Sequence, residues 1–130
     1  MPEPRSLLRI DSTAGLVVGV LVLLLSPWLS RLFALPLGFL VFTGAANLAY
    51  GSFSGSLARR SVRPRRLITV LVVANAAWAV LCLVSALTFA RSASGFGLLH
   101  LVGEALFVGG LAMLEWRHRE LLLVAPAAAT

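Results

Sequence analysis

The chain has 130 residues, of which 59% are hydrophobic and 12% charged, and its formal net charge at pH 7 is +6. Soluble proteins average about 25% charged residues, so this composition excludes an ordinary soluble domain and predicts a membrane protein. All eleven basic residues are arginine. They are not interleaved with aromatic residues, as a surface that stacks nucleic-acid bases would require, so no nucleic-acid partner is expected.

Four apolar runs occupy most of the chain, and each is close to the ~20 residues that a helix needs to cross a bilayer. They cover residues 13–35, 37–57, 67–89 and 97–116. The first run is followed by no small-residue cleavage site, so we expect it to remain as a helix. The prediction is an all-α, four-helix transmembrane bundle that forms a single domain, residues 1–130, with the lipid bilayer as its surroundings.

Polar residues and prolines mark the expected helix boundaries. Asp11, Ser12 and Thr13 offer side-chain oxygens to the free amides at the start of the first span, and the charge of Asp11 suits the positive end of the helix dipole. Pro36 is expected as the first residue of the second helix. Pro27 is expected to kink the last turns of the first span.

The arginines are unevenly distributed between the two ends of the predicted spans. Only Arg31 and Arg91 fall at one end. By the positive-inside rule the opposite end, with both termini, is cytoplasmic in a multi-pass protein of the cell membrane. We also expect the arginines of the loop 58–66 to bind anionic lipid headgroups, to determine topology, or to do both. The nine arginines at the cytoplasmic end are Arg5, Arg9, Arg59, Arg60, Arg63, Arg65, Arg66, Arg117 and Arg119.

Glycines recur at the spacing that permits close helix packing. Gly15 and Gly19 form a GxxxG pair in the first span, and Gly51 and Gly55 form another near the inner end of the second. Small residues at this spacing let two helix backbones approach each other. The motif predicts packing inside the bundle, with a homodimer interface as the alternative.

Glu104 lies about 12 Å below the outer end of the fourth span, at 1.5 Å per residue. A charged side chain at such depth costs on the order of 3 kcal/mol, so we expect it to face the bundle interior and to have partners. Asn47 and Asn75 lie near the same level of the second and third spans. We therefore predict a cluster of Asn47, Asn75 and Glu104 near the bilayer midplane.

Helical periodicity extends this cluster into a set that we call the polar seam: Asn47, Asn75, Trp78, His100 and Glu104. The polar seam has three possible roles: structural glue between helices, a proton- or ligand-responsive pocket, or a surface for a partner. His100 and Glu104 offer two metal ligands from one helix turn, but the spans contain no second pair. No metal and no cofactor are therefore expected.

Several motifs resemble those of a family of uncharacterised small four-helix integral membrane proteins of high-GC bacteria. These motifs are Leu8-Arg9-Ile10-Asp11, Leu35-Pro36, Ala74-Asn75-Ala76-Ala77-Trp78 and Glu104-Ala105. Ser26-Pro27-Trp28 is also similar to a repeated Ser-Pro-Trp signature of another membrane-protein family. The resemblance implies a location in the bacterial inner membrane, but it does not point to any activity.

No nucleophile–base pair, phosphate-binding loop or metal set is recognisable, so we do not expect an enzyme. The expectation is a structural or accessory component of a membrane complex, whose partner is another membrane protein or a second copy of the chain. The alternative is a small oligomeric transporter or ligand-binding protein in which Glu104 titrates.

Overall fold

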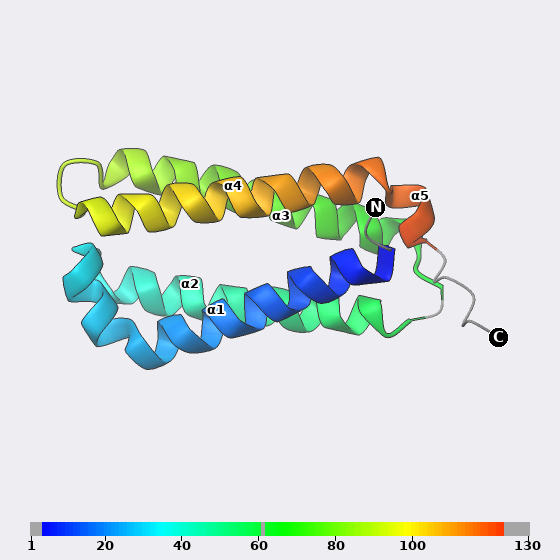
Figure 1. Cartoon of the computed structure of the whole chain (residues 1–130), viewed down its shortest axis with the longest axis horizontal. Helices are drawn as coiled ribbons and strands as arrows, with labels where there is room; N and C mark the ends of the chain where they lie inside the picture. The colour runs from blue at the N-terminus through cyan, green and yellow to red at the C-terminus, as the bar shows by residue number, and fades with distance from the viewer. Residues whose placement is uncertain (1–3, 61, 124–130) are drawn as a thin grey trace.

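The computed structural model describes residues 4–60 and 62–123, and this part of the chain is helical apart from short connections. The helices alternate in direction and form two hairpins, α1–α2 and α3–α4. The start of α1, the α2–α3 connection and α5 lie at one end of the molecule (Figure 1). The all-α prediction is confirmed. The helices are α1 (Pro4–Phe33), α2 (Leu37–Ala58), α3 (Arg65–Thr88), α4 (Gly95–Arg117) and α5 (Arg119–Leu122).

Three of the long helices are long and apolar enough to cross a membrane: α1 over Ser6–Phe33, α3 and α4. The remaining long helix, α2, has 22 residues, but several glycines and serines accompany Asn47 and Tyr50 in it. Large apolar side chains cover the outer surface, with exposed fractions of 73% for Leu24, 79% for Leu87 and 72% for Leu106. Water disfavours such a surface, whereas the hydrocarbon of a bilayer covers it. The coarse prediction of a membrane protein thus agrees with the structure.

The first helix begins well before the predicted boundary at residue 13. Leu7 and Leu8 are buried within α1, and Leu8 packs in an apolar cluster with Leu57 of α2 and Leu122 of α5. This burial stabilises the additional turns of α1. The predicted N-cap role of Asp11 is therefore wrong, because Asp11 lies inside the helix and is only 3% exposed.

The first hairpin is joined by a close approach of its two backbones. A Cβ atom on Gly15 would lie 3.0 Å from the carbonyl oxygen of Asn47, and one on Gly51 would lie 2.8 Å from the amide nitrogen of Leu16. The Ser12 hydroxyl donates to the Gly51 carbonyl at 2.8 Å. The predicted packing of the glycine pairs inside the bundle is observed, and these faces are already occupied within one chain.

The other members of the two glycine pairs pack in the same way. A Cβ atom on Gly19 would lie 2.9 Å from the carbonyl oxygen of Gly44, a glycine that the motif search did not select. A Cβ atom on Gly55 would lie 2.6 Å from the Ser12 hydroxyl oxygen. Both GxxxG pairs therefore serve the contact between α1 and α2.

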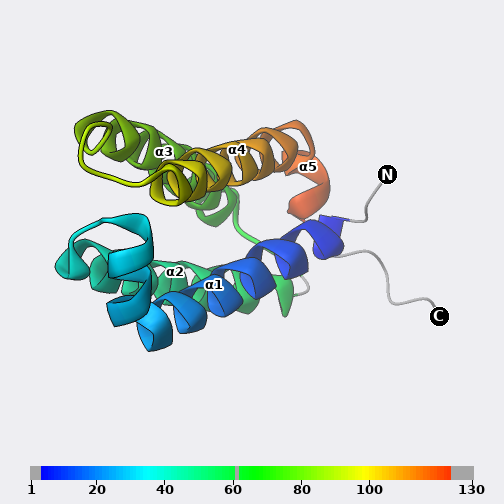
Figure 2. The ribbon, with the colours of Figure 1, turned by 60° about the vertical axis from the view of Figure 1, so that its left-hand side comes forward.

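The two hairpins pack less extensively on each other than the helices within each hairpin do. Contact between them involves mainly α1 and α4, and Figure 2 shows the hairpins as two separate layers. Two apolar clusters join the layers. The inner cluster, at the arginine-rich end, contains Leu8, Leu57, Ala58, Ile68, Leu71 and Leu122. The outer cluster, at the opposite end, contains Val22, Leu29, Leu35, Leu40, Ala86 and Leu101.

Arg63 differs from the other arginines of its loop, because its side chain is only 1% exposed. Its guanidinium donates to the carbonyl oxygens of Leu57 at 2.6 Å and Leu122 at 2.8 Å. These are carbonyls in the last turns of α2 and α5, which lack partners within their helices. The expected binding of Arg63 to lipid headgroups does not fit this burial, and its observed role is to cap two helices.

The remaining loop arginines, Arg59, Arg60, Arg65 and Arg66, are exposed. Arg65 forms an ion pair with Glu120 of α5 at 2.8 Å. The hydrogen bond from Arg65 holds the pKa of Glu120 below its usual value. This pair lies on the surface at the arginine-rich end, so it contributes little to stability.

At the opposite end, the connection between α3 and α4 docks on the end of α1. Ser94 caps α4 by accepting a hydrogen bond from the Gly97 amide, and its hydroxyl donates to the Leu32 carbonyl at 2.6 Å. The last turns of α1 change direction in Figure 1, and Pro27 lies inside this helix. Pro36 precedes α2 as its N-cap instead of being its first residue.

Candidate functional site

A cavity of about 230 Å³ lies between the two hairpins. All four long helices contribute to its lining, which is mainly apolar and includes three aromatic side chains. None of its lining residues belongs to the inner or the outer apolar cluster, and the clusters lie toward its two ends. We call it the central cavity. It is lined by Asp11, Ala14, Gly15, Val18, Ala46, Asn47, Tyr50, Ala74, Asn75, Trp78, Glu104, Phe107, Val108 and Leu111.

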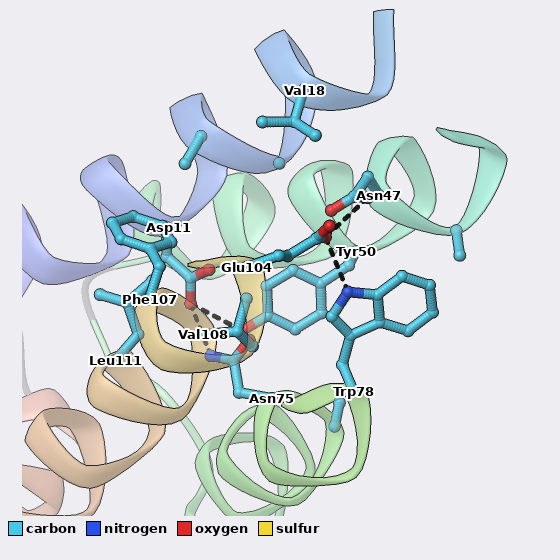
Figure 3. Close-up of a pocket in the computed structure, with 14 residues that line it drawn as sticks. Asp11, Val18, Asn47, Tyr50, Asn75, Trp78, Glu104, Phe107, Val108 and Leu111 are labelled. Carbon is cyan, nitrogen blue, oxygen red and sulfur yellow. Dashed lines mark hydrogen bonds between the residues drawn. The ribbon is translucent and has the colours of Figure 1, made fainter. Parts of the chain in front are cut away.

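Glu104 enters the central cavity from α4 and binds donors from both hairpins (Figure 3). Its Oε1 atom accepts hydrogen bonds from Asn47 Nδ2 at 3.2 Å and from Trp78 Nε1 at 2.8 Å. The Nε2 atom of His100, one turn earlier on α4, lies 3.4 Å from Oε2. Since the indole N–H can only donate, Oε1 must act as an acceptor. The Glu104 side chain is 11% exposed, so its charge is largely removed from solvent.

A second polar cluster surrounds Asp11, further toward the arginine-rich end of the bundle. The Oδ2 atom of Asp11 accepts from the Tyr50 hydroxyl at 2.6 Å and from Asn75 Nδ2 at 3.0 Å. Asn75 Nδ2 also donates to Glu115 Oε1 at 2.6 Å. One amide group thus links carboxyl groups of α1 and α4, while the tyrosine ties α2 to the same site.

The carboxyl groups of Asp11 and Glu115 are both buried deeply in the bundle. Asp11 is 3% and Glu115 0% exposed, and Glu115 Oε2 has no hydrogen-bond partner among the described residues. Both carboxyl groups are thus enclosed and share the Asn75 amide as a donor.

The structure brings together four of the five residues of the polar seam. Asn47, Trp78 and His100 all surround Glu104, and they come from α2, α3 and α4. Asn75 does not contact Glu104, contrary to the predicted cluster. It lies one turn before Trp78 on α3, and that turn places it beside Asp11 and Glu115.

Sequence reasoning missed three residues of this site: Asp11, Tyr50 and Glu115. Asp11 was assigned to a helix cap because the start of α1 was placed too late. Glu115 follows Glu104 by 11 residues and so shares its helical stripe, which was the available signal. Tyr50 had no signal of its own, since a tyrosine near a span end is usual at a membrane interface.

The described residues contain no group of three His, Cys, Asp or Glu side chains placed to hold a metal ion. What the central cavity offers instead is the acidic groups of Asp11 and Glu104, neutral donors and aromatic faces among apolar walls. Such a combination can bind a small ligand and compensate its charge.

Comparisons with protein-family models, with curated proteins and with solved structures gave no match. The resemblance to small bacterial four-helix membrane proteins thus stays a prediction, and the geometry of this chain is the basis for inferring its function.

Proposed function

We propose that this protein is a small membrane protein that binds a small molecule in the central cavity. The observation that supports this function is the cavity itself, about 230 Å³ between two hairpins that are packed tightly within themselves. Protein interiors are normally close-packed, and cavities of this size are few. A cavity with a few converging polar groups and apolar walls is the usual form of a ligand site.

The alternative of structural glue explains less of the geometry. Polar side chains that only join helices need partners, but they do not need an open volume beside them. In this chain the hydrogen bonds of Glu104 are made at the wall of the cavity, beside Ala14, Ala46 and Ala74, whose small side chains leave the space open.

For the placement in the membrane, we propose that all four long helices cross it and that both termini are cytoplasmic. At 1.5 Å per residue the 22 residues of α2 span about 33 Å, the thickness of the hydrocarbon core. Its antiparallel packing along α1 supports the same crossing (Figure 1). The exposed arginines near the ends of α2 and α3 favour the cytoplasmic side for that end.

The accessory function expected from the sequence has weaker support. It was expected to use the GxxxG pairs and the polar seam for helix association, and both GxxxG pairs pack within the first hairpin. We therefore propose ligand binding without chemistry as the function, in a protein of the bacterial inner membrane.

The test is the thermal stability of the purified protein in detergent with three ring-sized compounds: benzylamine, benzyl alcohol and benzoate. A ligand that binds only the folded state raises the Tm in proportion to its concentration over Kd. We expect at least one compound to raise it. The rise should be absent in Ala46→Leu, which fills the cavity, and retained in Ala49→Leu, which places the same side chain on the exposed face of α2.

Equal responses of both leucine variants and the original protein would show that the compounds act through the detergent or the outer surface. No response to any compound in the original protein would count against a ligand site.

A further inference from the structure

We infer that the ligand of the central cavity is a small lipophilic organic cation, bound by the Glu104 carboxylate against aromatic walls. This inference rests on the proposed function and adds the chemical class of the ligand. Three independent features of the cavity lead to it: the sign of its charges, the nature of its walls and its size.

The charged groups of the cavity are acidic. Asp11 enters from the first hairpin and Glu104 from the second, and none of the described residues that line the cavity is basic. His100 is outside the lining, stacked on Phe33 with ring centroids 4.8 Å apart, and its Nε2 atom lies 3.4 Å from Glu104 Oε2, so Oε1 is the carboxylate oxygen without a basic neighbour. An anionic ligand would be repelled, and a neutral ligand would leave the carboxylate charge uncompensated in a low-dielectric site. A monovalent cation compensates it.

The donors around Glu104 hold its carboxyl group in place as the partner of a cation. Asn47 and Trp78 both donate to Oε1, and hydrogen bonds to a charged acceptor are about twice as strong as those between neutral groups. These two donors also fix the direction of the carboxylate. Figure 3 shows Glu104 extended toward Asn47 and Trp78 within the cavity.

The walls distinguish an organic cation from an inorganic one. Tyr50, Trp78 and Phe107 contribute aromatic side chains to the lining, and most of the remaining lining is aliphatic. Aromatic faces attract a cation through the ring quadrupole, and they do so best when the cation is poorly hydrated. A metal ion would need several oxygen ligands, whereas a quaternary or tertiary ammonium group carries apolar substituents that these walls can cover.

The size limits the ligand to about one ring and a few further atoms. The cavity of about 230 Å³ exceeds the ~150 Å³ of an engineered apolar cavity that holds benzene. Phenyltrimethylammonium is a suitable cationic probe, and tert-butylbenzene is its neutral counterpart of the same shape, with carbon in place of the charged nitrogen.

The experiment is a titration of the full chain in lipid nanodiscs, followed by the fluorescence of Trp78. Trp28 and Trp116, which are 53% and 49% exposed, are replaced by phenylalanine so that Trp78 is the remaining tryptophan. Phenyltrimethylammonium and tert-butylbenzene are each added, with protein-free nanodiscs subtracted. The same titrations are made with Glu104→Gln, which keeps the shape and removes the charge.

A matched control is Glu120→Gln, which removes an equal charge at the arginine-rich end, outside the cavity. We expect saturable binding of the cation to the original protein. The Kd should be about tenfold or more higher in Glu104→Gln, and Glu120→Gln should leave it unchanged. The neutral counterpart should bind at least about tenfold more weakly than the cation in the original protein.

The remaining outcomes separate the two proposals. Equal binding of both probes, unaffected by Glu104→Gln, would overturn the cation inference and leave the ligand site intact. Binding of neither probe would overturn the inference as well; the thermal-shift panel with Ala46→Leu then decides the proposed function on its own. If Glu104→Gln does not fold, Ala74→Leu, which narrows the same cavity, must weaken cation binding for the inference to hold.

Discussion

The amide of Asn75 illustrates how one side chain determines the packing of several helices. Its nitrogen donates to Asp11 of α1 and to Glu115 of α4, while the Asn75 side chain itself is fully enclosed, at 2% exposed. Buried carboxyl groups that lose a donor remain desolvated without compensation, and this costs more than the hydrogen bond itself contributes. Loss of the Asn47 donor would leave its partner less exposed to this cost, because Glu104 still accepts a hydrogen bond from the Trp78 indole N–H.

We therefore predict that Asn75→Ala lowers the free energy of unfolding by on the order of 2 kcal/mol or more. Asn47→Ala should lower it by less than half as much, since Glu104 retains the Trp78 donor. Unfolding in mixed micelles, followed by circular dichroism, measures both. An equal or larger loss in Asn47→Ala would show that the Asn75 link between the hairpins has no special role.

The polar clusters around Glu104 and around Asp11 differ in how far the sequence predicted their residues. Glu104 and Asn47 were recognised because a polar side chain deep in an apolar run has an unfavourable free energy and therefore needs a partner. The same argument failed for Asp11, because its depth depends on where the first helix begins. The residues before Thr13 contain arginine as well as leucine, so no local pattern shows that Leu7 and Leu8 are buried by α2 and α5.

Among the described helices, α1 and α2 share the most extensive contact, and glycines let their backbones approach closely. The sequence showed the spacing of these glycines, but it did not show which helix they pack against. A GxxxG face fits a helix of the same chain as well as one of another chain. Gly44, which faces Gly19, has no GxxxG partner and could be found only from the structure.

We predict that Gly51→Ala destabilises the protein by about 1–3 kcal/mol, because the new methyl group would meet the Leu16 amide at 2.8 Å and the Ser12 carbonyl at 3.0 Å. Both contacts are with backbone, which cannot move aside as a flexible side chain can. Gly110→Ala is the control, since nothing lies within 4 Å of its added Cβ. Equal unfolding free energies for the two variants would contradict the close packing of α1 on α2.

The helix ends near the α2–α3 connection depend on Arg63. Its guanidinium donates to carbonyls of Leu57 and Leu122, and only a planar fork of donors can serve two helix ends at once. We predict that Arg63→Lys and Arg63→Ala both increase hydrogen exchange in the last turn of α2. The exposed neighbour Arg60 is the control, and Arg60→Ala should leave that exchange unchanged. Unchanged exchange in Arg63→Ala would contradict the capping role.

In the whole molecule, the sequence predicts the antiparallel helices of the two hairpins better than it predicts the central cavity. Long apolar runs predict long helices, and short connections predict antiparallel neighbours. The cavity depends instead on how the hairpins meet. It forms because the inner and outer apolar clusters hold the ends of the hairpins together while alanines and polar groups face each other between them. No periodicity along one helix contains that information.

Of the four long helices, α2 is the one that length and composition do not identify as a membrane span, and the order of the connections makes its crossing testable. With a cytoplasmic N-terminus and four crossings, the α3–α4 connection lies outside the cell membrane and the α2–α3 connection lies inside. If α2 rested on the membrane surface instead, α1 would still cross, and the two connections would exchange sides. The exposed residues Val62 and Ser92 mark the two connections.

We predict that a membrane-impermeant maleimide labels Ser92→Cys in intact cells and labels Val62→Cys only after the membrane is permeabilised. Both variants are made with Cys82→Ala, so that the buried native thiol cannot contribute. The reverse pattern would mean either that α2 does not cross or that the whole bundle has the opposite orientation, and either result would contradict the proposed topology. Labelling of both sites in intact cells would mean that the chain inserts in two orientations, against the distribution of its arginines.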